Sequence, residues 1–142
     1  MAIAKVKTEK YSHDEDLKNL CTYIVDPDKT INGYCTFGRG LDPDSAFEDM
    51  IELQELHGKT TGQRAYHIIV GFEDALGFCC EDAIEVAERV SDLVYSQCQV
   101  LCGVHTDTSH THAHFAVNTV PIGIGNKLHI DYSYANKLTS WL

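Results

Sequence analysis

The sequence has no apolar run long enough to cross a bilayer, which takes about 20 consecutive residues. Its first residues, MAIAKVKTEKYSHDED, lack the apolar core of a secretory signal. We therefore expect a cytoplasmic protein with no membrane partner. Hydrophobic residues make up 44% of the sequence and charged residues 23%, a composition that excludes a disordered or fibrous chain. The length of 142 residues is enough for one domain with a hydrophobic core.

None of the six cysteines forms a C-x-x-C pair, so the usual zinc-ribbon and redox motifs are absent. Cys98 and Cys102 lie in an apolar stretch, where cysteine packs as a small hydrophobic side chain. We therefore favour packing over metal binding for these thiols.

Positive charge is scarce, with 11 Lys and Arg against 21 Asp and Glu and a net charge of -10. Such a chain is not a general, sequence-blind binder of nucleic acid, because that affinity depends on neutralising phosphates. A local basic groove is still compatible with the sequence, since Lys29, Arg39 and Arg64 can gather in space. Solvated surface charge is the alternative for each of them.

The hydrophobic pattern predicts alternating helices and strands. A helix begins at a Ser12–Glu15 capping box, carries Tyr23 on its last turn, and ends before Pro27. Further helices are predicted from Asp42 to about residue 58, over 81–96, and from 132 onward; strands are predicted at 34–37, 64–72, 98–105 and 112–120, with turns at 73–78 and 106–111.

The short connection between the last two strands indicates antiparallel pairing. We expect a single α+β domain over residues 1–142, with an antiparallel central sheet, helices packed mainly on one face, and the other face open for function.

Four of the eight histidines lie in HTDTSHTHAH, residues 105–114. Because side chains alternate along a strand, His112 and His114 share one face, opposite the apolar face of Ala113 and Phe115. His105 can reach the same point from the facing strand. Three imidazoles with open positions are typical of a catalytic metal site, whereas surface histidines in a polar turn are the alternative.

Two further residues of this stretch are candidates for the same site. Asp107 can bind the ion or hold a histidine in one tautomer, and His110 lies in the turn. Imidazole suits manganese, iron, nickel, copper or zinc better than magnesium or calcium. The stretch does not match H-x-H-x-D-H, and H-E-x-x-H is absent, which excludes two common classes of zinc hydrolase.

HTDTSHTHAHFAVNTV resembles the third motif of plasmid mobilisation relaxases, H-x-D-x-x-x-x-H-x-H-x-x-x-N. These enzymes, of the MobA/VirD type, belong to the histidine-hydrophobe-histidine endonucleases. LCTYIVDPDKT is similar to their first motif, a tyrosine at a helix end followed by a proline-containing loop. FEDM, RAYHIIVGF and QVLCGVHTD follow in the family's order, so the resemblance covers nearly the whole chain.

The resemblance implies a metal-dependent enzyme that nicks and rejoins one DNA strand at an origin of transfer. A tyrosine attacks the scissile phosphate and stays joined to the 5′ end. Carried over by position, the roles are Tyr23 as nucleophile, His105, His112 and His114 as metal ligands, Asp107 as a catalytic residue, His67, His110 and Asn118 as supporting residues, and Lys29, Arg39 and Arg64 as DNA contacts.

We expect Mn²⁺ or Mg²⁺ as the ion, with Zn²⁺ or Ni²⁺ taken up in a purified sample. The expected partners are single-stranded DNA at the origin, accessory relaxosome proteins and a coupling protein. Family members are usually longer, so the chain is either a short natural form or the N-terminal part of a longer protein.

Several alternatives remain at this point. A rolling-circle replication initiator or transposase of the same superfamily commonly has its tyrosine after the histidines, as Tyr132 or Tyr134 would be. A non-catalytic metal or DNA-binding module and a metal hydrolase of small substrates are the others. Within the relaxase hypothesis, the rival nucleophiles are Tyr11, Tyr34 and Tyr66.

Overall fold

The computed structural model describes residues 2–73, 78–131 and 133–142. The turn predicted at 73–78 therefore falls largely outside the described residues. Within them, no helix is long and apolar enough to span a membrane.

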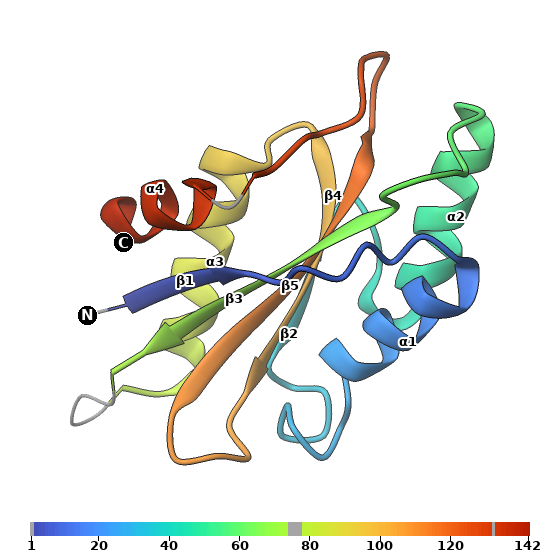
Figure 1. Ribbon diagram of the computed structural model, residues 1–142. Coiled ribbons are helices and arrows are strands. Elements are labelled where there is room, and N and C mark those ends of the chain that lie inside the picture. The colour runs from blue at the N-terminus through green and yellow to red at the C-terminus, as the bar shows by residue number, and fades with distance from the viewer. Residues whose placement is uncertain (1, 74–77, 132) are drawn as a thin grey trace.

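An antiparallel sheet forms the centre of the molecule, with the strand order β1-β3-β5-β4-β2 (Figure 1). The described elements are β1 Ala2–Val6, α1 Asp14–Ile24, β2 Thr36–Arg39, the 3₁₀ helix η1 Pro43–Ser45, α2 Ala46–Leu56, β3 Ala65–Phe72, α3 Cys80–Val94, β4 Cys98–His105, β5 Thr111–Pro121 and α4 Ser133–Trp141. The α+β class and the antiparallel sheet are confirmed. Strand β1 was not predicted.

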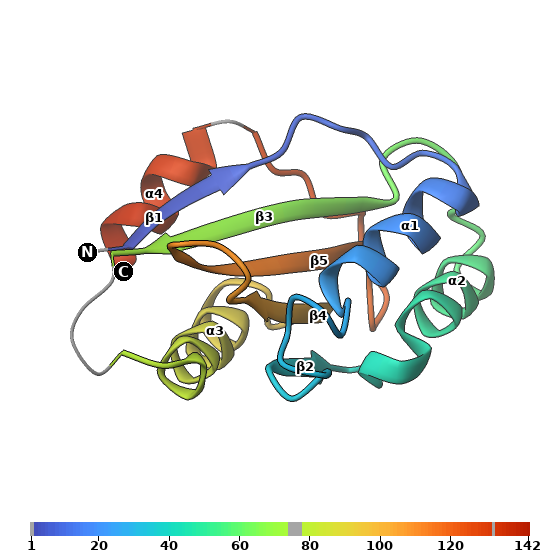
Figure 2. The same ribbon diagram turned by 90° about the horizontal axis from the view of Figure 1, so that it is seen from below.

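The two faces of the sheet pack against different helices. Phe115 and its neighbours on one face contact the core that includes α3 and α4. Leu101 and Ala116 on the other face pack under α1 and α2. Each face of the sheet is thus covered by two helices, whereas helices mainly on one face were expected. The α1–α2 pair and the α3–α4 pair lie toward opposite ends of the molecule in Figures 1 and 2. The part of the histidine face beyond α1 carries the cavities described below.

Helix α1 begins one residue later than predicted. His13 is the N-cap, and its backbone N–H donates to the Asp16 carboxylate at 3.3 Å, so the capping box involves these residues instead of Ser12 and Glu15. The second helix starts as predicted, because Asp42 accepts a hydrogen bond from the Asp44 N–H at 2.9 Å and Pro43 opens a 3₁₀ turn.

Gly103 allows the C-terminal end of α1 to lie directly on β4. A Cβ at this position would overlap the carbonyl oxygen of Ile24 and lie 2.9 Å from its carbonyl carbon. The apolar stripe of α1, with Leu17, Leu20 and Ile24 buried, holds the helix against the sheet. Tyr23, next to Ile24, is thereby brought over the histidine face.

The cysteines follow the expectation only in part. Cys98 and Cys102 are buried free thiols, as predicted. Cys35 and Cys80 form a disulfide that joins the segment before β2 to the first residue of α3, a pairing that the sequence pattern did not indicate.

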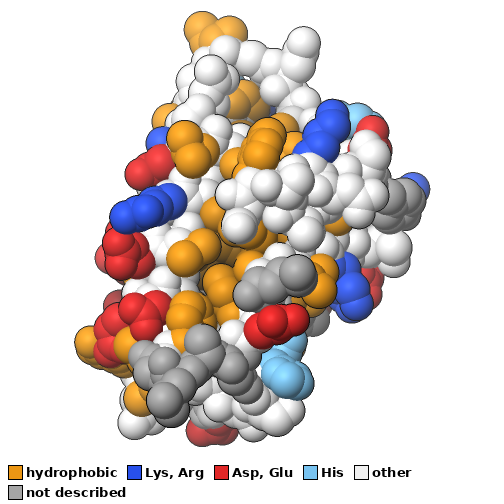
Figure 3. Space-filling view, turned by 90° about the vertical axis from the view of Figure 1, so that its left-hand side faces the viewer, with side chains coloured by type: hydrophobic (Ala, Val, Ile, Leu, Met, Phe, Trp, Pro, Cys, Tyr) orange, Lys and Arg blue, Asp and Glu red, His pale blue; other side chains and the backbone are white. Residues whose placement is uncertain are grey.

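The side of the molecule formed by β1, α3 and α4 has hydrophobic side chains gathered along its middle (Figure 3). Ile3 on β1 and Trp141 on α4 are among the exposed large hydrophobic residues. Ile3 also lines a cavity that includes His112, so its side chain lies on the face of the sheet that carries the histidines.

Candidate active site

Tyr23 projects from the last turn of α1 toward the histidines of β4 and β5. Its ring centroid lies 5.0 Å from that of His105 and 5.4 Å from that of His114, in edge-on arrangements. Tyr23 is 41% exposed and lines two cavities of this face.

The three predicted ligand histidines share the face of the sheet under Tyr23. His105 on β4 pairs directly with His112 on β5, and His114 follows two residues later. The rings of His105 and His114 stack at 4.0 Å, and those of His112 and His114 lie 6.4 Å apart. Strand alternation and an antiparallel hairpin register therefore bring together the residues that the sequence pattern selected.

A cavity of about 270 Å³ connects these groups. Its lining consists of Tyr23, Lys29, Ile69, His105, Asp107, Thr108, His112 and His114. The predicted nucleophile, the three ligand candidates and the candidate catalytic aspartate thus surround one space, large enough to admit a phosphate group.

Burial and crowding keep the deeper imidazoles neutral. Burial, followed by the neighbouring histidines, lowers the pKa of His114 to about 2. Burial also lowers the pKa of His67 to about 4 and that of His105 below its ordinary value. Neutral imidazole is the form that binds a metal ion.

Asp107 forms an ion pair with a lysine. Its carboxylate lies 2.9 Å from the Lys29 ammonium, and this hydrogen bond lowers the pKa of the aspartate. Lys29 also lies 5.8 Å from the centre of the Tyr23 ring. Asp107, predicted to bind the ion or to hold a histidine in one tautomer, thus forms an ion pair with a second residue that lines the cavity.

The donor types in the cavity suit a divalent ion, although the rings are engaged in bonds within the protein. The Nε2 of His105 lies 3.0 Å from the Ile24 carbonyl oxygen, and the Nδ1 of His114 lies 2.9 Å from the Nε2 of His67. As these rings lie, no three His, Cys, Asp or Glu side chains in the described ranges form a ligand set.

The hydrogen bond of His105 is nevertheless the kind that orients a metal-binding histidine. A carbonyl oxygen only accepts, so the Nε2 of His105 carries the proton and its Nδ1 keeps the lone pair. The three histidines therefore fit a divalent ion in donor type, and the fold holds the second ring nitrogen of His105.

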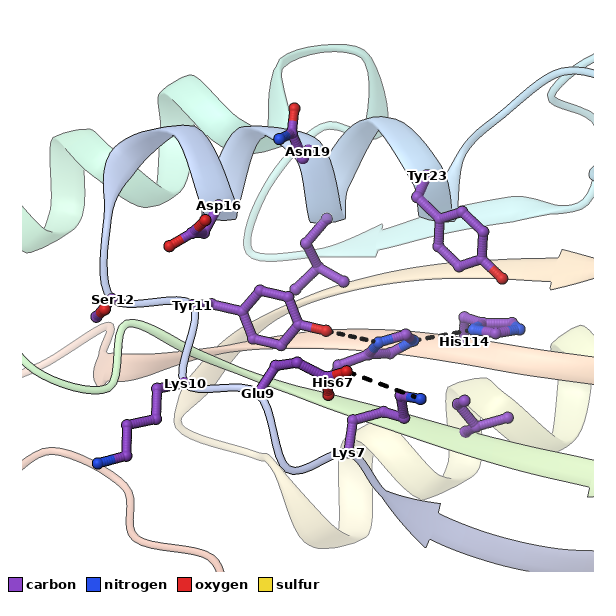
Figure 4. Close-up of a pocket in the computed structure, with 12 residues that line it drawn as sticks. Lys7, Glu9, Lys10, Tyr11, Ser12, Asp16, Asn19, Tyr23, His67 and His114 are labelled. Carbon is purple, nitrogen blue, oxygen red and sulfur yellow. Dashed lines mark hydrogen bonds and ion pairs between the residues drawn. The ribbon is translucent and has the colours of Figure 1, made fainter.

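A second cavity, of about 630 Å³, adjoins the first. Tyr23 and His114 line both spaces, and Lys7, Lys10 and Tyr11 line the second (Figure 4). The sequence pattern offered Tyr11 only as a rival nucleophile. The loop before α1, in which Tyr11 adopts a φ of 45°, places its side chain beside His67. No sequence motif predicted this contact.

Comparisons with known proteins identify the family of the chain. The family model described as "Relaxase: MobA/VirD2-like, nuclease domain" matches residues 23–141, most of the chain. The chain belongs to this relaxase family. The resemblance seen in the motifs is thereby confirmed.

Two curated relatives are each named Protein rlx, from Staphylococcus aureus. One is 31% identical over 93 residues, covering 63% of this chain and 28% of the relative; the other is 29% identical over 89 residues, covering 61% and 26%. Protein TraI from Escherichia coli is 28% identical over 76 residues, covering 53% of this chain and 10% of TraI. The chain thus spans less than a third of the length of these relatives. No solved structure matches it.

Asn118 and His110 of this relaxase domain lie away from the Tyr23 cavity. Asn118 is fully buried under α2, where it accepts from the Gln54 side chain and donates to that of Gln99, both at 2.9 Å. His110 is exposed in the hairpin and lines a different cavity, of about 370 Å³, together with His112.

The two arginines predicted to contact DNA have structural partners. Arg39 donates to the backbone carbonyls of Ser91 and Tyr95 at the end of α3. Arg64 is only 4% exposed and pairs with Asp14 at 2.8 Å. Both guanidinium groups bond to groups of the fold, and their role as DNA contacts stays a prediction. Of the three predicted cations, Lys29 alone lies at the site.

The rival tyrosines are placed differently from Tyr23. The hydroxyl of Tyr66 accepts a hydrogen bond from the Ile130 N–H in the core. Tyr134 packs near Tyr95, on the face opposite the histidines. Tyr34 is 66% exposed and interacts with Glu81. Tyr132 lies outside the described residues.

Proposed function

We propose that the chain is a relaxase domain, spanning residues 1–142, that nicks and rejoins one DNA strand at an origin of transfer during mobilisation of a plasmid or integrative element. The observation that carries this proposal is the position of Tyr23, over three histidines of neighbouring strands and across one cavity. Membership of the relaxase family supports it.

In the proposed reaction the Tyr23 hydroxyl oxygen attacks the scissile phosphorus. The Tyr23 hydroxyl loses its proton, the bond from phosphorus to the 3′ oxygen breaks, and the released 3′ oxygen takes up a proton to become a hydroxyl. The 5′ phosphate remains joined to Tyr23, and attack by a 3′ hydroxyl reverses these steps. A phenol is a weak nucleophile at neutral pH, so the site must stabilise the negative charge on the attacking oxygen and the phosphate.

Positive charge is available from two sources. His105, His112 and His114 would hold a divalent ion, Mn²⁺ or Mg²⁺ in the cell and Zn²⁺ or Ni²⁺ in a purified sample. When bound, such an ion supplies positive charge next to the phosphate oxygens. The ammonium group of Lys29, 5.8 Å from the Tyr23 ring centre, would favour the phenolate and is held there by Asp107.

Single-stranded DNA would continue from the Tyr23 cavity into the adjoining one. Tyr11 offers an aromatic surface to a base there, and Lys7 and Lys10 offer charges to phosphates. Because the net charge is -10, we expect accessory relaxosome proteins and a coupling protein to bring the domain to its origin. No membrane partner is proposed.

The test is a covalent-adduct assay. Labelled single-stranded DNA from the transfer region is mixed with protein and Mn²⁺ and resolved on a denaturing gel. Wild type and Tyr34→Phe, the matched exposed tyrosine, should retain label, whereas Tyr23→Phe and a chelator should abolish it. An adduct that survives Tyr23→Phe would exclude Tyr23 as nucleophile, and metal uptake without any adduct would favour a binding module.

A further inference from the structure

Three side chains from three segments form a continuous hydrogen-bonded line into the candidate active site (Figure 4). The Tyr11 hydroxyl lies 3.0 Å from the Nδ1 of His67, and the Nε2 of His67 lies 2.9 Å from the Nδ1 of His114. His67, on β3, and His114, on β5, are only 5% and 6% exposed. The bond between the two imidazoles is therefore buried, and the bond to Tyr11 is partly buried.

The two hydrogen bonds of this line can point in only two ways, because a neutral imidazole has one N–H and therefore donates from one ring nitrogen and accepts at the other. If Tyr11 donates to His67, then His67 donates to His114, and the Nε2 of His114 must carry the remaining proton. If His114 donates from Nδ1, then His67 accepts at Nε2 and donates from Nδ1 to the Tyr11 oxygen. Only the second direction leaves the Nε2 of His114 with a lone pair.

We propose that His67 and Tyr11 are positioning residues that hold His114 as its Nδ1–H tautomer, with the Nε2 lone pair available to a divalent ion. The inference rests on the proposed function, because it assigns His114 as a ligand. Metal-binding histidines usually donate their other N–H to an acceptor. For His105 this acceptor is the Ile24 carbonyl, and for His114 it is a second imidazole.

Using imidazole as the acceptor has a chemical consequence. A carboxylate in this position would add negative charge next to the ion and weaken its attraction for phosphate oxygens. His67 supplies the same hydrogen bond while remaining neutral. Tyr11 completes the line, because the Nδ1–H of a buried His67 would otherwise lack an acceptor.

The direct test is the tautomer of His114 in protein labelled with ¹⁵N at histidine. Long-range ¹H–¹⁵N spectra are recorded near pH 7.5 with a chelator present. We expect the proton of His114 on Nδ1 and that of His105 on Nε2. A His114 proton on Nε2 would overturn the proposal. The result does not depend on DNA cleavage, so failure of the adduct assay leaves it interpretable.

Metal affinity separates a positioning role from a merely structural one. Titration of Mn²⁺ should show binding weakened about 10- to 100-fold in His67→Phe, the usual effect of removing such a partner. His67→Gln, whose amide oxygen can accept from His114, should recover most of the affinity. Tyr11→Phe should weaken binding and Tyr34→Phe should not.

Two results of this titration would contradict the assignment. Equal affinity in wild type and a folded His67→Phe would show that His67 does not orient His114. Unchanged or tighter binding in Tyr11→Phe would show that the hydroxyl donates to His67, in the opposite direction.

Discussion

Replacing Gly103 with alanine tests whether close contact between α1 and β4 positions Tyr23, the proposed nucleophile. The added Cβ would lie 2.9 Å from the Ile24 carbonyl carbon and overlap its oxygen, whereas ordinary contacts begin near 3.4 Å. The end of α1 must therefore move outward by roughly 0.5 to 1 Å, or the strand must bend. Overpacking of this kind costs about 1–3 kcal/mol of the free energy of unfolding.

The same movement should impair the reaction more than the fold. It lengthens the 3.0 Å contact between His105 and the Ile24 oxygen and withdraws Tyr23 from the histidines. A displacement of about 1 Å can cost on the order of 100-fold in rate. We therefore expect Gly103→Ala to unfold at lower denaturant concentration and to form the DNA adduct at least tenfold more slowly.

The control for this variant is Gly123→Ala, because a Cβ at Gly123 would meet nothing within 4 Å. Urea unfolding and the initial rate of adduct formation are measured for both proteins. If Gly103→Ala matched Gly123→Ala in both quantities, the proposed role of the close contact would be wrong. Loss of stability with an unchanged rate per folded molecule would refute the link to Tyr23.

Three further predictions concern charge and buried polar groups. The pKa values of His67 and His114 are lower in the folded protein than in the unfolded chain, so the unfolded chain takes up protons first as the pH falls. The free energy of unfolding should therefore fall by about 1 kcal/mol per histidine between pH 7.5 and 5.5. Urea unfolding with a chelator present measures this change, and a flat pH profile would contradict it. Lys29→Ala should slow adduct formation about tenfold at nearly unchanged stability, since its ion pair is near the surface; Lys137→Ala on α4 is the control, and equal rates would argue against a role for Lys29. Asn118→Leu should lower the free energy of unfolding by about 2–4 kcal/mol, because buried amide partners lose their bonds; a catalytic role would instead reduce the adduct rate per folded molecule.

The histidine cluster could be predicted because residues close together in the sequence determine it. Alternation along one strand fixes the face of His112 and His114, and a short hairpin fixes the partner strand. The helix that ends at Tyr23 follows from its apolar spacing and Pro27. That Tyr23 lies over the histidines came only from family resemblance, because no local pattern relates α1 to the hairpin.

Long-range pairings were beyond the sequence pattern. Asp107 and Lys29 are 78 positions apart, and nothing in either stretch indicates that they pair. The burial of Arg64 depends on Asp14 and on Gln54 of α2, three segments whose contact follows from packing. Strand β1 has only five residues and gains its stability by pairing with β3, so its own sequence gave a weak signal.

The hydrogen bond from His105 to the Ile24 carbonyl joins the helix of Tyr23, the proposed nucleophile, to the histidine strand through the main chain. Tyr23 precedes Ile24, so its backbone is fixed relative to His105 before any DNA arrives. The conformational freedom left to the Tyr23 hydroxyl is then little more than the two side-chain torsions of this tyrosine. In the proposed reaction, most of the entropy of bringing the hydroxyl and the phosphate together would therefore be lost during folding, and rejoining would begin from the same backbone geometry as cutting.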